Sequence, residues 1–164
     1  MDTAEIYIQS PGTICICVDE YDHHSILGRI YYPENESPIH FNEIGKLFIK
    51  IDRILDEIHF PESSTSGRSF KVPIQNRLKS KEKASMKKMK IQQKGGKGTF
   101  VVQVQFRQHA TWQGKVLWAE KNETVNFRSA LELLKLIDSA LDESAATAEE
   151  ESAEINEKTK TAKD

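Results

Sequence analysis

An internal repeat constrains the fold of this chain more than any other feature of its sequence. Residues 12–57 align with residues 98–143 without a gap, at a constant offset of 86 positions. Thirteen of the 46 aligned positions are identical, whereas ordinary composition would give about 3. The identical pairs include Gly28/Gly114, Phe41/Phe127, Leu47/Leu133, Ile51/Ile137, Asp52/Asp138 and Asp56/Asp142. The two segments are therefore expected to share one fold.

The spacing of apolar residues predicts the same elements in both copies. In the second copy, apolar residues alternate with polar ones from Phe100 to Phe106, which is typical of a half-buried strand. A second strand follows over 112–118, and a short third strand ends at Phe127. The period then becomes helical, with Leu133, Leu134, Ile137 and Leu141 in one stripe. The first copy repeats this order, so each copy is predicted to be a β-β-β-α module.

We therefore predict an α+β fold made of a duplicated β-β-β-α module, an antiparallel meander plus one amphipathic helix, in a pseudo-twofold arrangement. Whether the modules share one sheet or pack face to face stays open at this point. Trp112 and Trp118 align with Ile26 and Tyr32, which favours a role in packing, although aromatic residues also form stacking platforms for bases. The predicted core comprises Trp112, Trp118, Phe127, Leu134, Ile137, Tyr32, Phe41, Phe48 and Ile51.

Charge is segregated along the chain, although the net charge is only −2. The first module is expected over 12–58 and the second over 98–144. Between them, residues 59–97 form a Ser-rich and then Lys-rich connector with room for one or two short strands. The acidic tail, 145–164, has a composition that predicts either disorder or an exposed extension of the last helix.

The Lys-rich part of the connector is the candidate for nucleic-acid binding. Residues 68–97 hold 11 Lys and Arg against the single acid Glu82. Such an arm can neutralise the phosphates of RNA or DNA, but its composition favours a solvated linker, or one whose charge is balanced by the acidic tail. The candidate phosphate contacts are Arg77, Lys79, Lys81, Lys83, Lys87, Lys88 and Lys90.

Metal binding and catalysis find little support in the sequence. Cys15, Cys17, His23 and His24 are close together, but their spacing matches no zinc motif and the second copy does not repeat the set. The repeated aspartate pairs, four residues apart on each predicted helix, are interpreted as a solvated helix face. The chain shows no nucleophile–base arrangement and no phosphate-binding glycine loop. We therefore predict no catalytic residue, no metal ligand and no cofactor.

The second copy resembles a group of small uncharacterised bacterial proteins. The shared pattern is R-Q-x-A-T-W-Q-G, then W-x-E, then F-R-S-A-L-E-L, which this chain carries within residues 106–141. The first copy departs from that pattern, with YDHHSILG and FNEIGKL at the aligned positions. The resemblance implies a compact bacterial domain and assigns no site residues.

These features favour a non-enzymatic protein-interaction or regulatory module in the cytoplasm. We expect a monomer with an internal pseudo-dimer, no contact with membranes, and another protein as the partner, bound at a sheet edge or at the outer sheet face. Nucleic-acid binding through the connector is the alternative. Small-molecule binding in a pocket between the modules is the third hypothesis.

Overall fold

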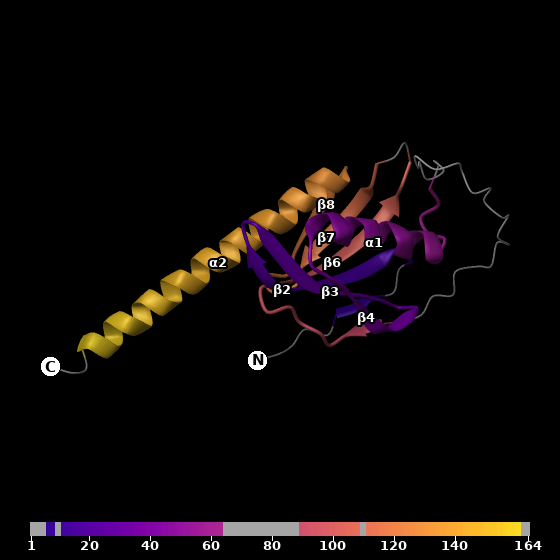
Figure 1. Ribbon diagram of the computed structural model, residues 1–164. Helices are drawn as coiled ribbons and strands as arrows, with labels where there is room; N and C mark the ends of the chain where they lie inside the picture. Colours follow the sequence, from indigo (N-terminus) through magenta and orange to yellow (C-terminus); the bar gives the residue numbers. More distant parts are fainter. Residues whose placement is uncertain (1–5, 9–10, 64–88, 109–110, 162–164) are drawn as a thin grey trace.

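The computed structural model describes residues 6–8, 11–63, 89–108 and 111–161, and it confirms the duplicated fold. The first module contains β2 (Thr13–Asp22), β3 (Ser25–Tyr32), β4 (Asn35–Phe41) and α1 (Ile44–Glu57). The second contains β6 (Gly98–Phe106), β7 (Gln113–Trp118), β8 (Glu123–Phe127) and α2 (Ala130–Thr161). The modules share one six-stranded antiparallel sheet in the order β4-β3-β2-β6-β7-β8, which resolves the question of their arrangement (Figure 1).

A pseudo-twofold axis passes through the centre of this sheet, between β2 and β6. Cys15 lies opposite Val101, and these two residues occupy the same position in the aligned repeats. On either side of this pair, Thr13 faces Gln103 and Cys17 faces Thr99. In the aligned repeats Thr13 is equivalent to Thr99 and Cys17 to Gln103, so a twofold rotation exchanges these two pairs. Antiparallel pairing of two equivalent strands about one residue pair therefore joins the modules symmetrically.

The register within each module is also duplicated. Ile16 pairs with Ile30, and the equivalent Val102 pairs with Val116. Both modules interrupt this ladder with a bulge next to the glycine of the second strand, after Val18 and after Val104. Bulges bend a strand and increase its twist, so each module curves its outer end in the same way.

A glycine accompanies each bulge because a neighbouring strand approaches too closely for any side chain. A Cβ atom on Gly28 would lie 2.2 Å from the carbonyl oxygen of Cys17, and one on Gly114 would lie 1.9 Å from that of Gln103. The paired phenylalanines, Phe41 and Phe127, cover these glycines from the third strand of each module. The glycine repeat therefore reflects contact between strands and not the approach of a helix.

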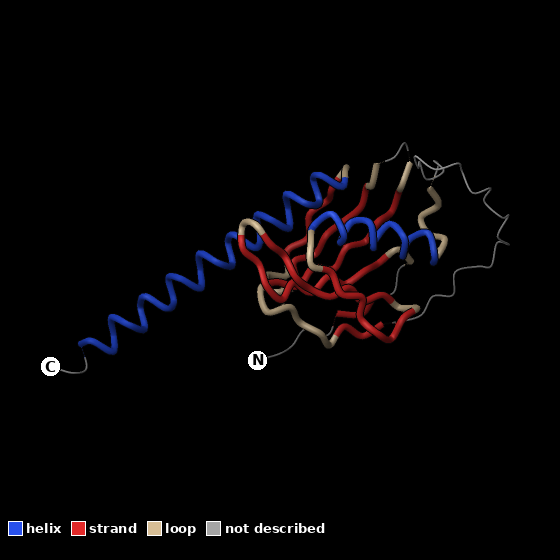
Figure 2. Tube along the Cα trace, viewed as in Figure 1, coloured by secondary structure: helices blue, strands red, loops and turns tan. Residues whose placement is uncertain are grey.

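Both helices pack on the same face of the sheet, where they close the main hydrophobic core (Figures 1 and 2). Side chains that alternate along β2 and β6, such as Ile16 and Val102, are fully buried beneath them. Of the predicted core residues, the buried ones are Tyr32, Phe41, Ile51, Trp118, Phe127 and Ile137. Trp112 and Phe48 are half-buried and pack against this core, and Leu134 is half-buried.

A smaller apolar cluster lies on the opposite face of the sheet, around the pseudo-twofold axis. It contains Cys15, Cys17 and Val101, with Tyr31 and Leu117 packed against them. Both thiols are fully buried, and their sulfur atoms lie 3.9 Å apart. The hydrogen bond with Cys17, together with burial, raises the pKa of the Cys15 thiol. These cysteines therefore act as small core residues on a strand.

Two further strands form a separate ribbon, in which β1 (Ile6–Ile8) pairs with β5 (Met89–Ile91). Figure 1 shows this ribbon on the side of the sheet that faces away from the helices. The segment after β5 is tied to the central sheet, since the amide of Lys97 donates to the carbonyl oxygen of Val18. Arg29 reinforces this contact by donating to the carbonyl oxygen of Lys94 and to both carboxylate oxygens of Asp19.

The two helices begin differently, although they are equivalent. In α2, the Ser129 hydroxyl accepts a hydrogen bond from the amide of Glu132, and the Glu132 carboxylate accepts one from the amide of Arg128. These contacts cap the helix. The residue aligned with Ser129 in the first module is Glu43, which is the N-cap of α1 and makes no side-chain capping bond.

The second helix also extends well beyond the body of the molecule (Figure 1). Among its described side chains, the last buried ones are Ala140 and Leu141, and residues 145–155 are all exposed. Within the part of the chain that the structure describes, no helix combines the length and apolarity needed to cross a membrane.

Candidate binding cleft between the two modules

A cleft of about 560 Å³ opens between the two helices at one end of the sheet. Its walls come from the β2–β3 turn, from the start of α1 and from the N-terminal part of α2, so both modules contribute. The lining residues are Tyr21, Asp22, His23, His24, Ser25, Ile26, Asn42, Glu43, Ile44, Gly45, Leu134, Ile137, Asp138 and Leu141. This volume lies in the range of small-molecule sites, about 300–1,000 Å³.

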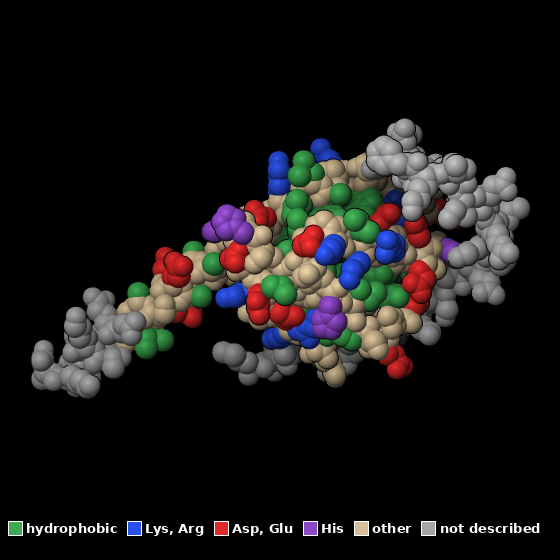
Figure 3. All heavy atoms as spheres, viewed as in Figure 1, with side chains coloured by type: hydrophobic (Ala, Val, Ile, Leu, Met, Phe, Trp, Pro, Cys, Tyr) green, Lys and Arg blue, Asp and Glu red, His purple; other side chains and the backbone are tan. Residues whose placement is uncertain are grey.

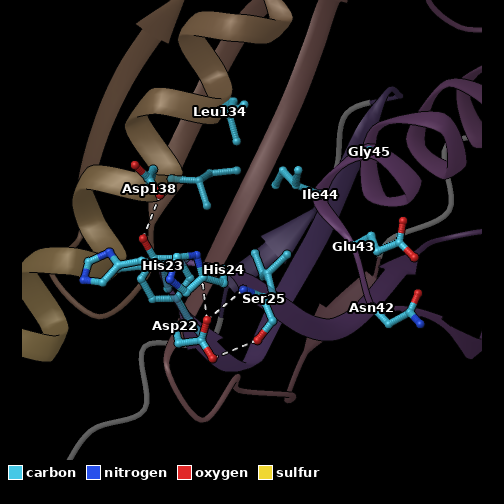
Figure 4. Close-up of a pocket in the computed structure, with 14 residues that line it drawn as sticks. Asp22, His23, His24, Ser25, Asn42, Glu43, Ile44, Gly45, Leu134 and Asp138 are labelled. Carbon is cyan, nitrogen blue, oxygen red and sulfur yellow. Dashed lines mark hydrogen bonds between the residues drawn. The ribbon is translucent and has the colours of Figure 1, made fainter.

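The inner walls of the cleft are apolar. Ile44 of α1 and Leu134 of α2 point toward each other across it (Figure 4). Ile26, Ile137 and Leu141 belong to the buried core and form its deeper surface. In the space-filling view, hydrophobic side chains gather between the helices, with acidic and histidine side chains beside them (Figure 3). The cleft thus combines an apolar interior with a polar rim.

A tyrosine of the first module contacts two carboxylates of the second at this rim. The Tyr21 hydroxyl lies 2.7 Å from Oδ1 of Asp138 and 2.9 Å from Oδ1 of Asp142, and it donates to this pair. Burial and these two carboxylates raise the pKa of Tyr21 well above its ordinary value. The phenol therefore stays protonated and remains a donor. His23 Nδ1 lies 3.6 Å from the same oxygen of Asp142.

The turn that forms the base of the rim is held by Asp22. Its carboxylate accepts hydrogen bonds from the amides of His24 and Ser25 and from the Ser25 hydroxyl (Figure 4). The backbone bond from His24 is the main reason that the pKa of Asp22 is lowered. Asp22 is thus already engaged in shaping the turn.

The pseudo-twofold axis places an equivalent contact at the other end of the sheet. Arg107 stands where the first module has Tyr21, and its Nη1 lies 3.1 Å from Asp52 and 2.8 Å from Asp56. Its Nε donates to the carbonyl oxygen of Pro61, and the side chain is 4% exposed. Each helix therefore receives a donor from the strand of the other module. The aspartate pairs, interpreted from the sequence as a solvated face, are exposed but also serve as acceptors between modules.

The end of the sheet opposite the cleft contains aromatic rings at the positions where the cleft has aliphatic side chains. Phe48 of α1 stacks on Trp112, with ring centroids 5.6 Å apart. The aligned residues in the cleft are Leu134 and Ile26. The cleft therefore opens where the second copy of the aromatic pair is missing. The alignment contained this signal, but the Trp112/Ile26 equivalence was interpreted only as evidence for a role in packing.

The predicted nucleic-acid contacts cannot be compared with this geometry. Arg77, Lys79, Lys81, Lys83, Lys87 and Lys88 lie outside the described residues. The backbone of Lys90 forms the middle of β5, but its side chain is not described. Nucleic-acid binding by the connector stays a prediction.

Metal binding was also considered for the described ranges. Among them, no group of three or more His, Cys, Asp or Glu residues is arranged to hold a metal ion. No protein-family model, curated protein or solved structure matches the chain. Its resemblance to the small bacterial proteins with the A-T-W-Q-G pattern therefore stays a prediction, and the function has to be argued from the cleft.

Proposed function

We propose that this protein is a non-enzymatic, ligand-binding regulatory module and that its ligand binds in the cleft between the two modules. The observation that carries this proposal is the cleft itself, about 560 Å³ in volume and lined by both modules. Of the functions that the sequence suggested, small-molecule binding between the modules is the one that this geometry supports best.

The composition of the cleft suits a binding site. Burial of apolar ligand surface provides most of the affinity in such sites, while a few polar groups fix the orientation of the ligand. Ile26, Ile44 and Leu134 offer the apolar surface, and Asp138 and His24 lie among the polar groups beside it. A ligand in this position contacts α1 and α2 at once, so its binding stabilises one arrangement of the modules.

The proposal is tested with tryptophol, a neutral indole alcohol small enough for the cleft. In a titration followed by amide resonances in nuclear magnetic resonance spectra, we expect shifts at Ser25, Gly45 and Asp138. The double variant Ile26→Trp/Leu134→Phe, which installs the aromatic pair of the other module, should abolish these shifts. A matched control, Leu27→Trp/Ile49→Phe, adds the same rings at exposed positions and should bind as the wild type does. If neither tryptophol nor a charged indole of similar size shifts a resonance of the cleft, the proposal is wrong.

A protein partner at the sheet edge is the second candidate, and a difference between the two edges favours it. The edge strand β4 contains Pro38, which has no amide hydrogen and opposes pairing with a further strand. The other edge strand, β8, contains no proline, and its Val125 is 45% exposed. Strand β8 is therefore the edge that accepts an added strand.

This second candidate predicts a specific loss of binding. Val125→Lys places a charge on β8 that opposes an added strand, so this variant should lose protein partners that the wild type captures while it keeps the binding of tryptophol. Capture of the same partners by both proteins would contradict a site on β8.

A further inference from the structure

The two ends of the sheet are copies of one site, and only one of them is filled by the chain's own side chains. A comparison of the two therefore indicates which chemical groups the open cleft lacks. This comparison rests on the proposed function, because it concerns the ligand of the same cleft.

At the filled end, a cation contacts both members of the carboxylate pair. The buried guanidinium of Arg107 lies within 3.1 Å of both Asp52 and Asp56. The rings of Phe48 and Trp112 occupy the neighbouring space between α1 and the strands. The site thus holds a positive charge beside aromatic surface.

At the open end, the equivalent carboxylates receive no such cation. Tyr21 replaces Arg107, and its neutral hydroxyl satisfies one oxygen each of Asp138 and Asp142 without balancing their charge. Among the described residues that line the cleft, none is Lys or Arg. Next to the pair, His23 is 3.6 Å from Asp142, and its side chain is 80% exposed.

The other carboxylates of the cleft are already engaged. Asp22 accepts the hydrogen bonds of its turn, and Glu43 pairs with Lys46 at 2.6 Å. Asp138, which lines the cleft, and Asp142 beside it share the neutral Tyr21 hydroxyl as a donor, and they are the carboxylates left for a cation from outside. The missing rings leave room beside them, since Ile26 and Leu134 replace Trp112 and Phe48.

We infer that the cleft binds an organic cation, an amine or guanidine attached to an aromatic or aliphatic body. The cationic group lies against Asp138 and Asp142, as Arg107 lies against their counterparts. The apolar body fills the space between Ile44 and Leu134. Charge complementarity and the filled copy of the site point to the same ligand class.

Three indoles of similar size and different charge test this inference, namely tryptamine (cationic), tryptophol (neutral) and indole-3-propionate (anionic). Their dissociation constants are measured by the same resonance titration at neutral pH. We expect tryptamine to bind about tenfold more tightly than tryptophol, because its ammonium group can donate charged hydrogen bonds to the carboxylates. The gain is limited to about this size because the site is partly exposed to water. Indole-3-propionate should bind most weakly.

Two variants locate the source of the preference. Asp138→Asn/Asp142→Asn removes the charges but keeps the oxygen acceptors for Tyr21, and it should reduce tryptamine affinity to that of tryptophol. Tyr21→Arg supplies the guanidinium internally and should have the same effect. The control Glu149→Gln/Glu150→Gln removes two charges from the exposed part of α2 and should preserve the preference.

The outcomes separate this inference from the proposed function. If tryptophol binds in the cleft and tryptamine binds no more tightly, the ligand is not a cation, although the cleft is a binding site. Tighter binding of indole-3-propionate, or a preference for tryptamine that survives in both charge variants, likewise overturns the inference. If none of the three indoles binds, the proposed function fails, and the inference fails with it.

Discussion

Trp118 provides a direct test of the packing argument, because it is 8% exposed while the other tryptophan, Trp112, is half-buried. Truncation of Trp118 to Ala removes ~150 Å² of buried apolar surface, or about 4 kcal/mol at ~25 cal/mol per Å². This agrees with the range of ~3–5 kcal/mol observed for large aromatic residues in cores. Domains are commonly stable by ~5–15 kcal/mol, so the variant should be close to unfolding.

The assay is urea unfolding followed by far-ultraviolet circular dichroism, with two comparison variants. Trp112→Ala should cost less, about 1–2 kcal/mol, because part of that side chain is already in water. Trp118→Phe should cost less than ~1.5 kcal/mol, since it keeps a ring that can stack on Phe100. The indole nitrogen of Trp118 has no hydrogen-bond partner in the described chain, so its loss carries no penalty. The reasoning is refuted if Trp118→Ala unfolds at the wild-type urea concentration, or if Trp112→Ala is the more damaging change.

Three further predictions concern other parts of the fold. Gly114→Ala should destabilise the protein by ~1–3 kcal/mol in urea unfolding, because the added Cβ atom would meet a backbone carbonyl. Gly45→Ala should be neutral or stabilising, because no atom lies within 4 Å of its added Cβ atom, and equal effects of the two variants would contradict this account. The hydrogen bond from Arg29 lowers the pKa of Asp19. The pair therefore stabilises the fold fully above the unfolded-state pKa of ~3.9, and this stabilisation is lost as the pH falls through the lower folded-state pKa of Asp19. Between pH ~6 and ~3 the urea midpoint should therefore fall less in Asp19→Asn than in the wild type, and a parallel fall would count against the pair. Truncation after Ser144 should leave the melting temperature nearly unchanged, because residues 145–155 are exposed; a marked drop would show that the tail contacts the body.

The local elements were predictable because their signals are local. Alternation in β6 and the helical stripe of α2 follow from side chains a few residues apart, and the repeat doubled the evidence for each. The same repeat supported the burial of Phe41 and Phe127, which the structure places against the glycines of the bulges.

The arrangement of the modules was not predictable from these signals. Pairing of β2 with β6 depends on contacts between residues far apart in the sequence, such as Cys15 and Val101, and no periodicity specifies them. The contacts that Tyr21 and Arg107 make with the helix of the other module were not predictable for the same reason. Each faces the aspartates of a helix that belongs to the other copy, so their roles emerge only once the shared sheet is known.

The symmetry of the sheet has a consequence for how such a cleft can arise. In a dimer of two identical chains, every substitution occurs twice, so an aromatic pair that fills one end of the sheet would also fill the other. Two copies joined in one chain are free of that restriction. One copy of the site retains Arg107, Phe48 and Trp112 as permanent packing, while the other is released to change its side chains without weakening its twin. Covalent linkage of the modules is thus what permits one end to hold the fold together and the other to specialise.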